Sequence, residues 1–599
     1  MTQRFVQYLP LLALLFFLPF LGSIHLFDWD EINFAESSRE MLVSGNYGRV
    51  QINFLPFWEK PPLFFWLQAL CMHIFGIGEF AARLPNALVG ILTLFTLFRI
   101  GEYLAGKAFA HTWALLLFGS FLPHLYFKSG IIDPLFNYFI FLSVFFLTQT
   151  RAQVKRKKAL HFAAWAGLCS GLAVLTKGPV SLLLVGLTFG AMSVGHFVEK
   201  FNNKNTISTP KNVPTIPPNH HINAIIAVYM TTTLIVCTLW LGYETAHNGW
   251  WFIETFIRYQ IRLFSTPDAG HAQPFYYHFV VILLGCFPLS IWGAAALAQK
   301  IQLLLPYNKQ YSNNPNDNSH VNTADIGTDV SVGTNTNANA EKLTNNAMHC
   351  LFWAVLLVFS IAQTKIIHYS SAAYLPLSYL AAKWVYAKSI HYDKNEHFIP
   401  NIVKWLYCFV GTIWAIVLLL LPLLAMNPHY LLPFMKDPFA KACLQIPIHW
   451  NGYEWLPAIF FIFMFGLSIW QIKRHQVAQA TRQMNWAIAL TLLVWMPSVL
   501  PKIEAFSQKP LIDFCQSLAG KDVHVMSLGF KSYAPLFYAQ VSPQNQQPQS
   551  REQALSDTLK KDIYFITKTN KHKGLDTLPT IQHLHSEGGY TFWLKKAKP

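Results

Sequence analysis

The feature that most constrains this chain is a series of apolar runs, each near the length that crosses a bilayer. A membrane-spanning helix needs about 20 mostly apolar residues, and about thirteen runs approach that length. They lie at roughly 5–26, 80–100, 108–125, 131–150, 160–176, 179–198, 223–242, 276–299, 350–362, 370–387, 402–425, 455–472 and 483–500. Only 12% of the residues are charged, about half the usual share of a soluble domain. The pattern predicts a polytopic α-helical membrane protein.

Basic residues follow alternate runs and predict the orientation. They gather at 151–158, 200–211, 383–394 and 473–482. Loops rich in Lys and Arg stay in the cytoplasm, so the N-terminus is expected there too. The stretch at 27–66 then lies outside, together with the C-terminal tail. The net charge of +16 comes largely from these cytoplasmic loops, and we expect no nucleic-acid partner.

The stretch at 27–66 is dense in charge: Asp28, Asp30, Glu31, Glu36, Arg39, Glu40, Glu59 and Lys60. Each such charge costs about 2.5–3.5 kcal/mol at the bilayer centre, so we expect a wet loop at the membrane surface. A short helix is predicted over 31–44, with Asp30 near its N-cap and Gly45 as its end. A second helix is predicted from Pro62 to Gly76. Its N-terminus presents free backbone N–H groups beside Lys60, an arrangement that suits a phosphate.

The remaining organisation is predicted from composition. Residues 1–501 form the membrane domain, and 27–79 its first outer loop. Residues 307–346 are polar and almost free of aromatics, and this predicts a disordered cytoplasmic loop. Residues 502–599 are expected to form a small extracytoplasmic α/β domain. Its helices are predicted at 511–518 and 551–561, and its strands at 523–529, 535–541, 562–569 and 590–596.

Several motifs together resemble one family. They are the DE at Asp30, EKPPLFFWL from Glu59, GEFAARLP from Gly78, the IID that ends at Asp133, the TKGP at Lys177 and HAQPFYYH from His271. The combination resembles the bacterial lipid A aminoarabinose transferases, which belong to the protein-mannosyltransferase-like group of GT-C glycosyltransferases. One departure is Asn33, where the family often has arginine. The resemblance implies a GT-C fold with a small C-terminal α/β domain.

The candidate catalytic residues are Asp30, Glu31 and Asp133. Glycosyl transfer to a hydroxyl needs a carboxylate near the nucleophile, and Asp30 matches the family's first-loop catalytic aspartate. A helix N-cap would equally account for Asp30 on spacing alone. Glu31 is the second candidate. Asp133 starts a span before Pro134, where an N-cap is an equally good explanation.

The candidate contacts to a donor phosphate are basic or aromatic residues of separate outer segments. They are Lys60, Lys177, Arg262, Tyr259, Lys365 and His368. A salt bridge to Glu59 is the alternative for Lys60, and a lysine that snorkels at a helix end is the alternative for Lys177. For Glu36, Arg39 and Glu40, whose spacing allows ion pairing along a helix, a surface network is expected.

The resemblance also implies a divalent metal, zinc in particular, between Glu59 and His271. Two protein ligands fall short of the usual three or four, so a positioning role is expected. No G-x-G-x-x-G motif follows a strand, and no nucleotide cofactor is expected. Cys443 and Cys515 would both lie outside, and the sequence leaves open whether they pair.

The resemblance implies an inverting glycosyltransferase that takes a sugar from a polyprenyl phosphate at the outer face of the bacterial inner membrane. The acceptor would be lipid A. A protein O-mannosyltransferase-like activity, or transfer to another envelope glycan, is the alternative among enzymes. A transporter or flippase is the alternative from another class. Transporters tend to show repeated halves and ionisable residues at mid-membrane, and this chain shows neither clearly.

Overall fold

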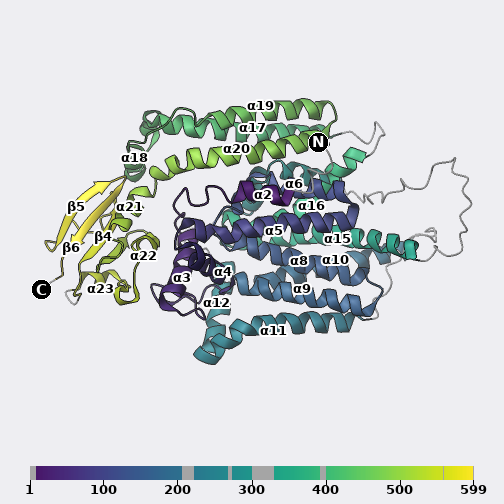
Figure 1. Ribbon diagram of the computed structural model, residues 1–599, viewed down its shortest axis with the longest axis horizontal. Coiled ribbons are helices and arrows are strands. Elements are labelled where there is room, and N and C mark those ends of the chain that lie inside the picture. Colours follow the sequence, from purple (N-terminus) through teal and green to yellow (C-terminus); the bar gives the residue numbers. More distant parts are fainter. Residues whose placement is uncertain are drawn as a thin grey trace, which may run out of the picture.

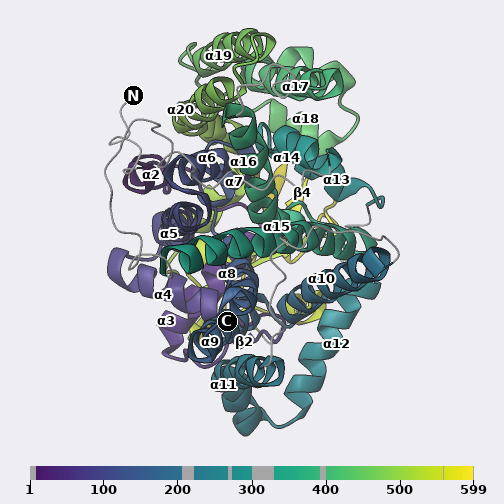
Figure 2. The same ribbon diagram turned by 90° about the vertical axis from the view of Figure 1, so that its right-hand side faces the viewer.

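The computed structural model describes residues 9–204, 221–266, 273–299, 329–390, 399–556 and 559–597. Long helices run side by side along one axis and form the body of the molecule, with a small β-sheet at one end (Figure 1). We call this end, where α3, α4 and the sheet lie, the domain end. Figure 2 looks along the bundle and shows α17, α19 and α20 together on one side, packed against α6, α14 and α16.

Helices occupy the positions of the predicted spans. In chain order they are α2 (Leu9–Phe17), α5 (Glu79–Ala105), α6 (Lys107–Phe118), α7 (Phe121–Tyr126), α8 (Asp133–Ala152), α9 (Arg156–Lys177), α10 (Val180–Lys204), α11 (Ile222–Asn248), α13 (Tyr277–Gly285), α14 (Leu289–Ala298), α15 (Asp329–Ile361), α16 (Tyr374–Ile390), α17 (Asn401–Met426), α19 (Leu456–Lys473) and α20 (Val477–Ala505). Seven of the described helices are long and apolar enough to cross a membrane. Other predicted spans are interrupted: α6 is followed by α7, and α13 by α14. The prediction of a polytopic helical membrane protein is confirmed.

The first outer loop carries α3 (Asp30–Ser44), the two-residue strands β1 (Gln51–Ile52) and β2 (Leu55–Pro56), and α4 (Leu63–Phe75). Both predicted helices are present. The left-handed Gly45, with φ 70°, ends α3, and α4 ends at Gly76. Asn53 and Phe54 connect β1 to β2 and both have positive φ, as a tight two-residue hairpin requires. The amphipathic α12 (Trp251–Ser265) also lies at the domain end (Figure 1).

The C-terminal domain contains a four-stranded sheet in the order β3-β4-β6-β5. The strands are β3 (His524–Leu528), β4 (Ile563–Lys568), β5 (Ile581–Glu587) and β6 (Tyr590–Lys595), and β3 and β4 pair in parallel. The helices α21 (Lys509–Ser517), α22 (Ala534–Tyr538) and α23 (Arg551–Leu555) complete it. The predicted strand at 535–541 is wrong, because α22 starts there with Pro535 in its first turn. Strand β5 was not predicted.

The prediction of disorder over 307–346 is wrong for residues 329–346, which belong to α15; residues 307–328 lie outside the described residues. Glu341 is 4% exposed and pairs with Lys383 of α16 at 2.6 Å. Thr344 is fully buried. A polar segment is helical here because α16 supplies a buried partner for its charge. Cys443 and Cys515 are both unpaired and buried.

Candidate functional site

Four side chains from separate elements meet at the domain end, and we call them the Asp30 cluster: Asp30, Asp133, Lys177 and His368. Asp133 is the first residue of α8, and Lys177 the last residue of α9. Lys177 Nζ lies 2.5 Å from Asp133 Oδ1. His368 lies in the 3₁₀ helix η1 (Ile367–Ala373). Its Nε2 is 3.4 Å from Asp30 Oδ2 and 3.7 Å from Asp133 Oδ2, so the imidazole lies between two carboxylates.

The Asp30 cluster has unused hydrogen-bonding capacity. Asp133 is 2% exposed, yet its Oδ2 has no hydrogen-bond partner in the described part of the chain. A buried acceptor without a donor is costly and is rare in native proteins. Asp30 retains access to solvent, because 36% of its side chain is exposed. The arrangement can therefore accept hydrogen bonds from a ligand with hydroxyl or amino groups.

Asp30 is placed differently from the predicted N-cap. It is the first residue of α3, the cap position is Trp29, and Trp29 makes no side-chain capping hydrogen bond. Trp29 has a positive φ of 78°, a conformation that is uncommon outside glycine. The turn directs the chain into α3, and the Asp30 carboxylate faces His368 instead of the helix N-terminus.

Lys60 lies next to the Asp30 cluster. Its Nζ donates a hydrogen bond to the Tyr259 hydroxyl at 3.3 Å and lies 5.1 Å from the centre of that ring. The Arg262 guanidinium lies 5.1 Å from the same ring. Tyr259 thus has two cations at its ring, and α12 contributes both Tyr259 and Arg262. The alternative prediction for Lys60 is a salt bridge to Glu59, and the ion pairs of the described residues do not include it.

The pKa of Lys60 shows that these groups share one electrostatic environment. Burial lowers the pKa of the Lys60 ammonium, and the positive charge of Lys177 lowers it further. The negative charges of Glu59, Asp30 and Asp133 act in the opposite direction. A phosphate placed between Lys60 and Lys177 would relieve the repulsion between the two cations.

Glu31, adjacent to Asp30 in the chain, has a full set of partners. Its carboxylate pairs with Arg83 at 2.8 Å and accepts hydrogen bonds from the backbone N–H groups of Phe27 and Gly130. Burial raises the pKa of Glu31, but Arg83 and the two N–H groups outweigh this, and the net pKa is lowered. Arg83 also donates to the carbonyls of Leu21 and Ile24. This geometry supports a structural role for the predicted catalytic candidate Glu31.

The expected surface network of Glu36, Arg39 and Glu40 is wrong, because all three are at most 2% exposed. Arg39 forms two hydrogen bonds of 2.7 Å with Glu36 and donates a third, also 2.7 Å, to the carbonyl of Val541 in the C-terminal domain. Glu40 accepts from the N–H groups of Asn53 and Phe54. This part of α3 is therefore buried, in part against the C-terminal domain, whereas residues 43–47 at the end of the helix are exposed as predicted.

Two further predictions concern Lys365 as a phosphate contact and Glu59 and His271 as metal ligands. Lys365 is 5% exposed and donates to the carbonyl of Ala362 at 2.7 Å, at the end of α15, which accounts for it without a phosphate. His271 lies outside the described residues, so the Glu59–His271 metal site is not tested. The described residues contain no group of three or more His, Cys, Asp or Glu placed to hold a metal.

Sequence reasoning missed two residues of the C-terminal domain that lie near the site. Lys531 Nζ is 5.2 Å from the centre of the Trp29 ring. The Tyr533 backbone N–H donates to Asp28 Oδ1 at 3.1 Å. The only signal in the sequence is the segment GFKSY after a predicted strand, which reads as an ordinary loop.

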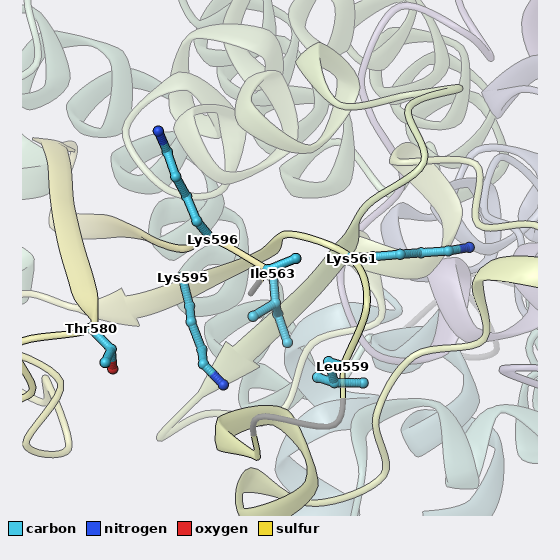
Figure 3. Close-up of a pocket in the computed structure, with 7 residues that line it drawn as sticks. Leu559, Lys561, Ile563, Thr580, Lys595 and Lys596 are labelled. Atoms are coloured by element: carbon cyan, nitrogen blue, oxygen red, sulfur yellow. The ribbon is translucent and has the colours of Figure 1, made fainter. Parts of the chain in front are cut away.

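A cavity of about 180 Å³ lies elsewhere in the C-terminal domain (Figure 3). Figure 3 shows Lys561, Lys595 and Lys596 around it. Lys561 pairs with Asp522 at 2.7 Å, and Lys595 donates to the carbonyls of Leu555 and Ser556 at the C-terminal end of α23. None of the lining residues belongs to the Asp30 cluster, and the two lysines described here already have protein partners.

Comparison with known proteins identifies related sequences. Residues 59–207 match the family model described as dolichyl-phosphate-mannose-protein mannosyltransferase. The chain is 26% identical over 292 residues to undecaprenyl phosphate-alpha-4-amino-4-deoxy-L-arabinose arabinosyl transferase 1 of Proteus mirabilis, which covers 48% of this chain and 49% of that protein. A transferase of the same name from Wigglesworthia glossinidia brevipalpis is 22% identical over 76% of this chain and 74% of its own length. The match thus spans about half the length of the first of these relatives.

A solved structure has the same fold. The crystal structure of ArnT from Cupriavidus metallidurans bound to undecaprenyl phosphate superposes with a TM-score of 0.71, at 15% identity and over 100% of both chains. The apo form of that protein gives a TM-score of 0.69 at 14% identity. The chain therefore has the GT-C fold of ArnT and is similar in sequence to the aminoarabinosyl transferases.

Proposed function

We propose that the protein transfers 4-amino-4-deoxy-L-arabinose, or a closely similar sugar, from undecaprenyl phosphate to a phosphate of lipid A, with inversion at the anomeric carbon. The observation that carries the proposal is the Asp30 cluster, which combines carboxylates and cations from α3, α8, α9 and η1. The names of the similar transferases support the donor. The fold shared with a protein that was crystallised with undecaprenyl phosphate supports a polyprenyl donor.

Lys60 and Lys177 are the proposed contacts to the donor phosphate, and Tyr259 and Arg262 lie beside Lys60. Lys177 is paired with Asp133 at 2.5 Å, so an arriving phosphate takes over part of that pairing. This exchange leaves Asp133 available to the hydroxyl or amino groups of the sugar. Fixed cations beside the leaving phosphate stabilise the charge that develops there in the transition state.

The acceptor decides the role of Asp30. When a phosphate monoester oxygen attacks the anomeric carbon, a new C–O bond forms and the bond to the undecaprenyl phosphate oxygen breaks. The acceptor dianion becomes a diester monoanion, while the leaving group changes from monoanion to dianion. No proton needs to be removed, so Asp30 positions the sugar through its carboxylate. A hydroxyl acceptor would instead require Asp30 to take a proton.

A second candidate, transfer to a protein hydroxyl, is favoured by one specific observation. The family model that matches residues 59–207 is that of the protein mannosyltransferases. The two functions differ in their dependence on a base. Substitution of Asp30 by Asn should reduce transfer to a hydroxyl far more than transfer to a phosphate.

The proposed location is the bacterial inner membrane, with the Asp30 cluster on the periplasmic side. The support is the distribution of basic residues, which gather at 151–158 and 473–482, between helices and away from the outer loops. This orientation puts α3 and the C-terminal domain outside. Labelling of single cysteines at Asn46 and Lys158 with a membrane-impermeant reagent tests it: only the first should react in intact spheroplasts.

Purified protein in lipid nanodiscs should be incubated with undecaprenyl-phosphate aminoarabinose and either bisphosphorylated lipid A or a serine-rich peptide, and the products identified by mass spectrometry. The proposal predicts a lipid A product heavier by one aminopentose. A product formed on the peptide alone would favour the second candidate. Unchanged donor with both acceptors would overturn the proposal.

A metal between Glu59 and His271 remains a proposal, and no step above depends on it. Elemental analysis of the purified protein is the direct test. One equivalent of zinc that is lost in both Glu59→Ala and His271→Ala would support the site. Zinc retained in both variants would contradict it.

A further inference from the structure

The segment that joins β3 to α22 brings the C-terminal domain to the turn before Asp30. The Tyr533 backbone N–H donates to Asp28 Oδ1 at 3.1 Å, and Tyr538 Oη accepts from the Leu26 N–H at 2.8 Å. Helix α22 packs against α3 (Figure 1). The contacts fix residues 529–533 against the turn that positions the proposed catalytic carboxylate.

Lys531 is an exposed cation in this segment. Its Nζ lies 5.2 Å from the centres of both the Trp29 and the Tyr533 rings. Trp29 is 40% exposed and directly precedes Asp30. Two aromatic rings thus hold this ammonium at the exposed surface beside the turn that precedes Asp30, where an anionic group of a ligand can reach it.

The surroundings of Tyr533 connect this segment with the site. Burial raises the pKa of the Tyr533 hydroxyl, and the negative charges of Glu59 and Asp30 also raise it, while Lys531 opposes them. The pKa of the Tyr533 hydroxyl therefore depends on both carboxylates. Lys531 adds a positive charge from the C-terminal domain, whereas Lys60 and Lys177 come from the membrane domain.

We infer that Lys531 binds an anionic group of the acceptor as it approaches Asp30, with Trp29 and Tyr533 holding the ammonium in place. The acceptor is accordingly a phosphorylated molecule; an uncharged polypeptide would gain nothing from this residue. The inference rests on the proposed function and assigns the acceptor contact that the proposal leaves open. The two domain assignments follow: the membrane domain binds the donor phosphate, and the C-terminal domain binds the acceptor.

The test compares Lys531→Ala, Lys531→Arg and Lys521→Ala in nanodiscs. Lys521 is an exposed lysine of the same domain and is no part of the site, so it serves as the matched control. With bisphosphorylated lipid A and undecaprenyl-phosphate aminoarabinose, K531A should raise the acceptor KM about tenfold, the effect of losing one charge-assisted contact. The donor KM should not change. K531R should stay within about twofold of the wild type, and K521A should match it.

A binding measurement keeps the inference separate from the proposed reaction. Native mass spectrometry of the same variants with bisphosphorylated lipid A alone should show about tenfold weaker binding for K531A, without any need for turnover. If the wild type binds lipid A but transfers nothing to it, the proposed function fails and the contact stands. Equal lipid A binding and equal acceptor KM in K531A and the wild type would overturn the inference, as would an equal rise of the donor and acceptor KM.

Discussion

The charged residues of α3 differ in their surroundings: the first residue of the helix is partly exposed, and those that follow are buried. Asp30 is partly exposed, and its ionic partner among the described residues is the His368 imidazole, 3.4 Å away. Glu31, Glu36 and Arg39 are buried, and most of their polar atoms are bound to protein groups at 2.5–2.9 Å. The comparison teaches that a buried charge with a full set of partners maintains the fold. A charge with capacity left over is the one available to a ligand.

Asp30→Asn should give the largest effect on activity. If the acceptor is a hydroxyl and Asp30 is the base, turnover should fall by about 10²- to 10⁴-fold. If the acceptor is a phosphate, the expected loss is at the low end of this range. The unfolding temperature in detergent should be unchanged, because the partly exposed Asp30 carboxylate is not part of a buried hydrogen-bond network. Near-normal turnover in D30N would show that Asp30 is no more important for activity than the buried charges of α3. Asp133 would then be the better candidate for the catalytic carboxylate.

Glu31→Gln is the matched acid-to-amide change one residue along the chain. Breaking its buried pair with Arg83 should cost roughly 3–5 kcal/mol of folding free energy. Thermal unfolding measures this loss. Turnover per folded molecule should fall less than tenfold, since Glu31 does not face the Asp30 cluster. A stable E31Q protein without activity would instead make Glu31 the catalytic carboxylate.

Lys60→Ala should raise the donor KM by about tenfold, the effect of one charge-assisted hydrogen bond to phosphate. The acceptor KM should be unaffected, in contrast to the Lys531 variant. Steady-state kinetics with each substrate varied in turn provide the measurement. Lys60→Arg, which keeps the charge, is the control. Parallel changes in both KM values would mean that Lys60 supports the structure of the loop.

Glu40→Gln should give the smallest effect. Burial and the charge of Glu36 raise the pKa of Glu40 from 4.5 to about 9, so the folded protein keeps this proton at neutral pH, and Gln replaces a neutral group. Because the unfolded chain releases the proton near pH 4.5, wild-type stability should fall as pH rises between about 4.5 and 9. E40Q should flatten this dependence. An E40Q protein much less stable at pH 6 would show that Glu40 is ionised there.

The sequence predicts the elements whose cause is local. α3 and α4 end where Gly45 and Gly76 follow, because glycine adopts the positive φ that ends a helix. The long apolar runs predict the bundle, because a bilayer leaves few alternatives. The motifs around Asp133 and Lys177 predict functional residues, and in the structure both Lys177 and His368 lie within 4 Å of the Asp133 carboxylate.

The sequence could not predict contacts between distant segments. The burial of Arg39 depends on the carbonyl of Val541, and the helical state of residues 338–346 depends on Lys383. The segment 535–541 reads as a strand from its aromatic residues, but packing against α3 and Pro535 at a helix start favour α22. The proximity of Lys531 to the turn before Asp30 also could not be predicted, because it depends on the contact between Lys531 and Trp29.

The most direct test of the account is a structure of this protein in nanodiscs with undecaprenyl phosphate bound. The phosphate should lie within about 3 Å of both Lys60 Nζ and Lys177 Nζ, and the Lys177–Asp133 distance should be longer than 2.5 Å. A phosphate bound away from both lysines, with the Lys177–Asp133 pair intact, would contradict it.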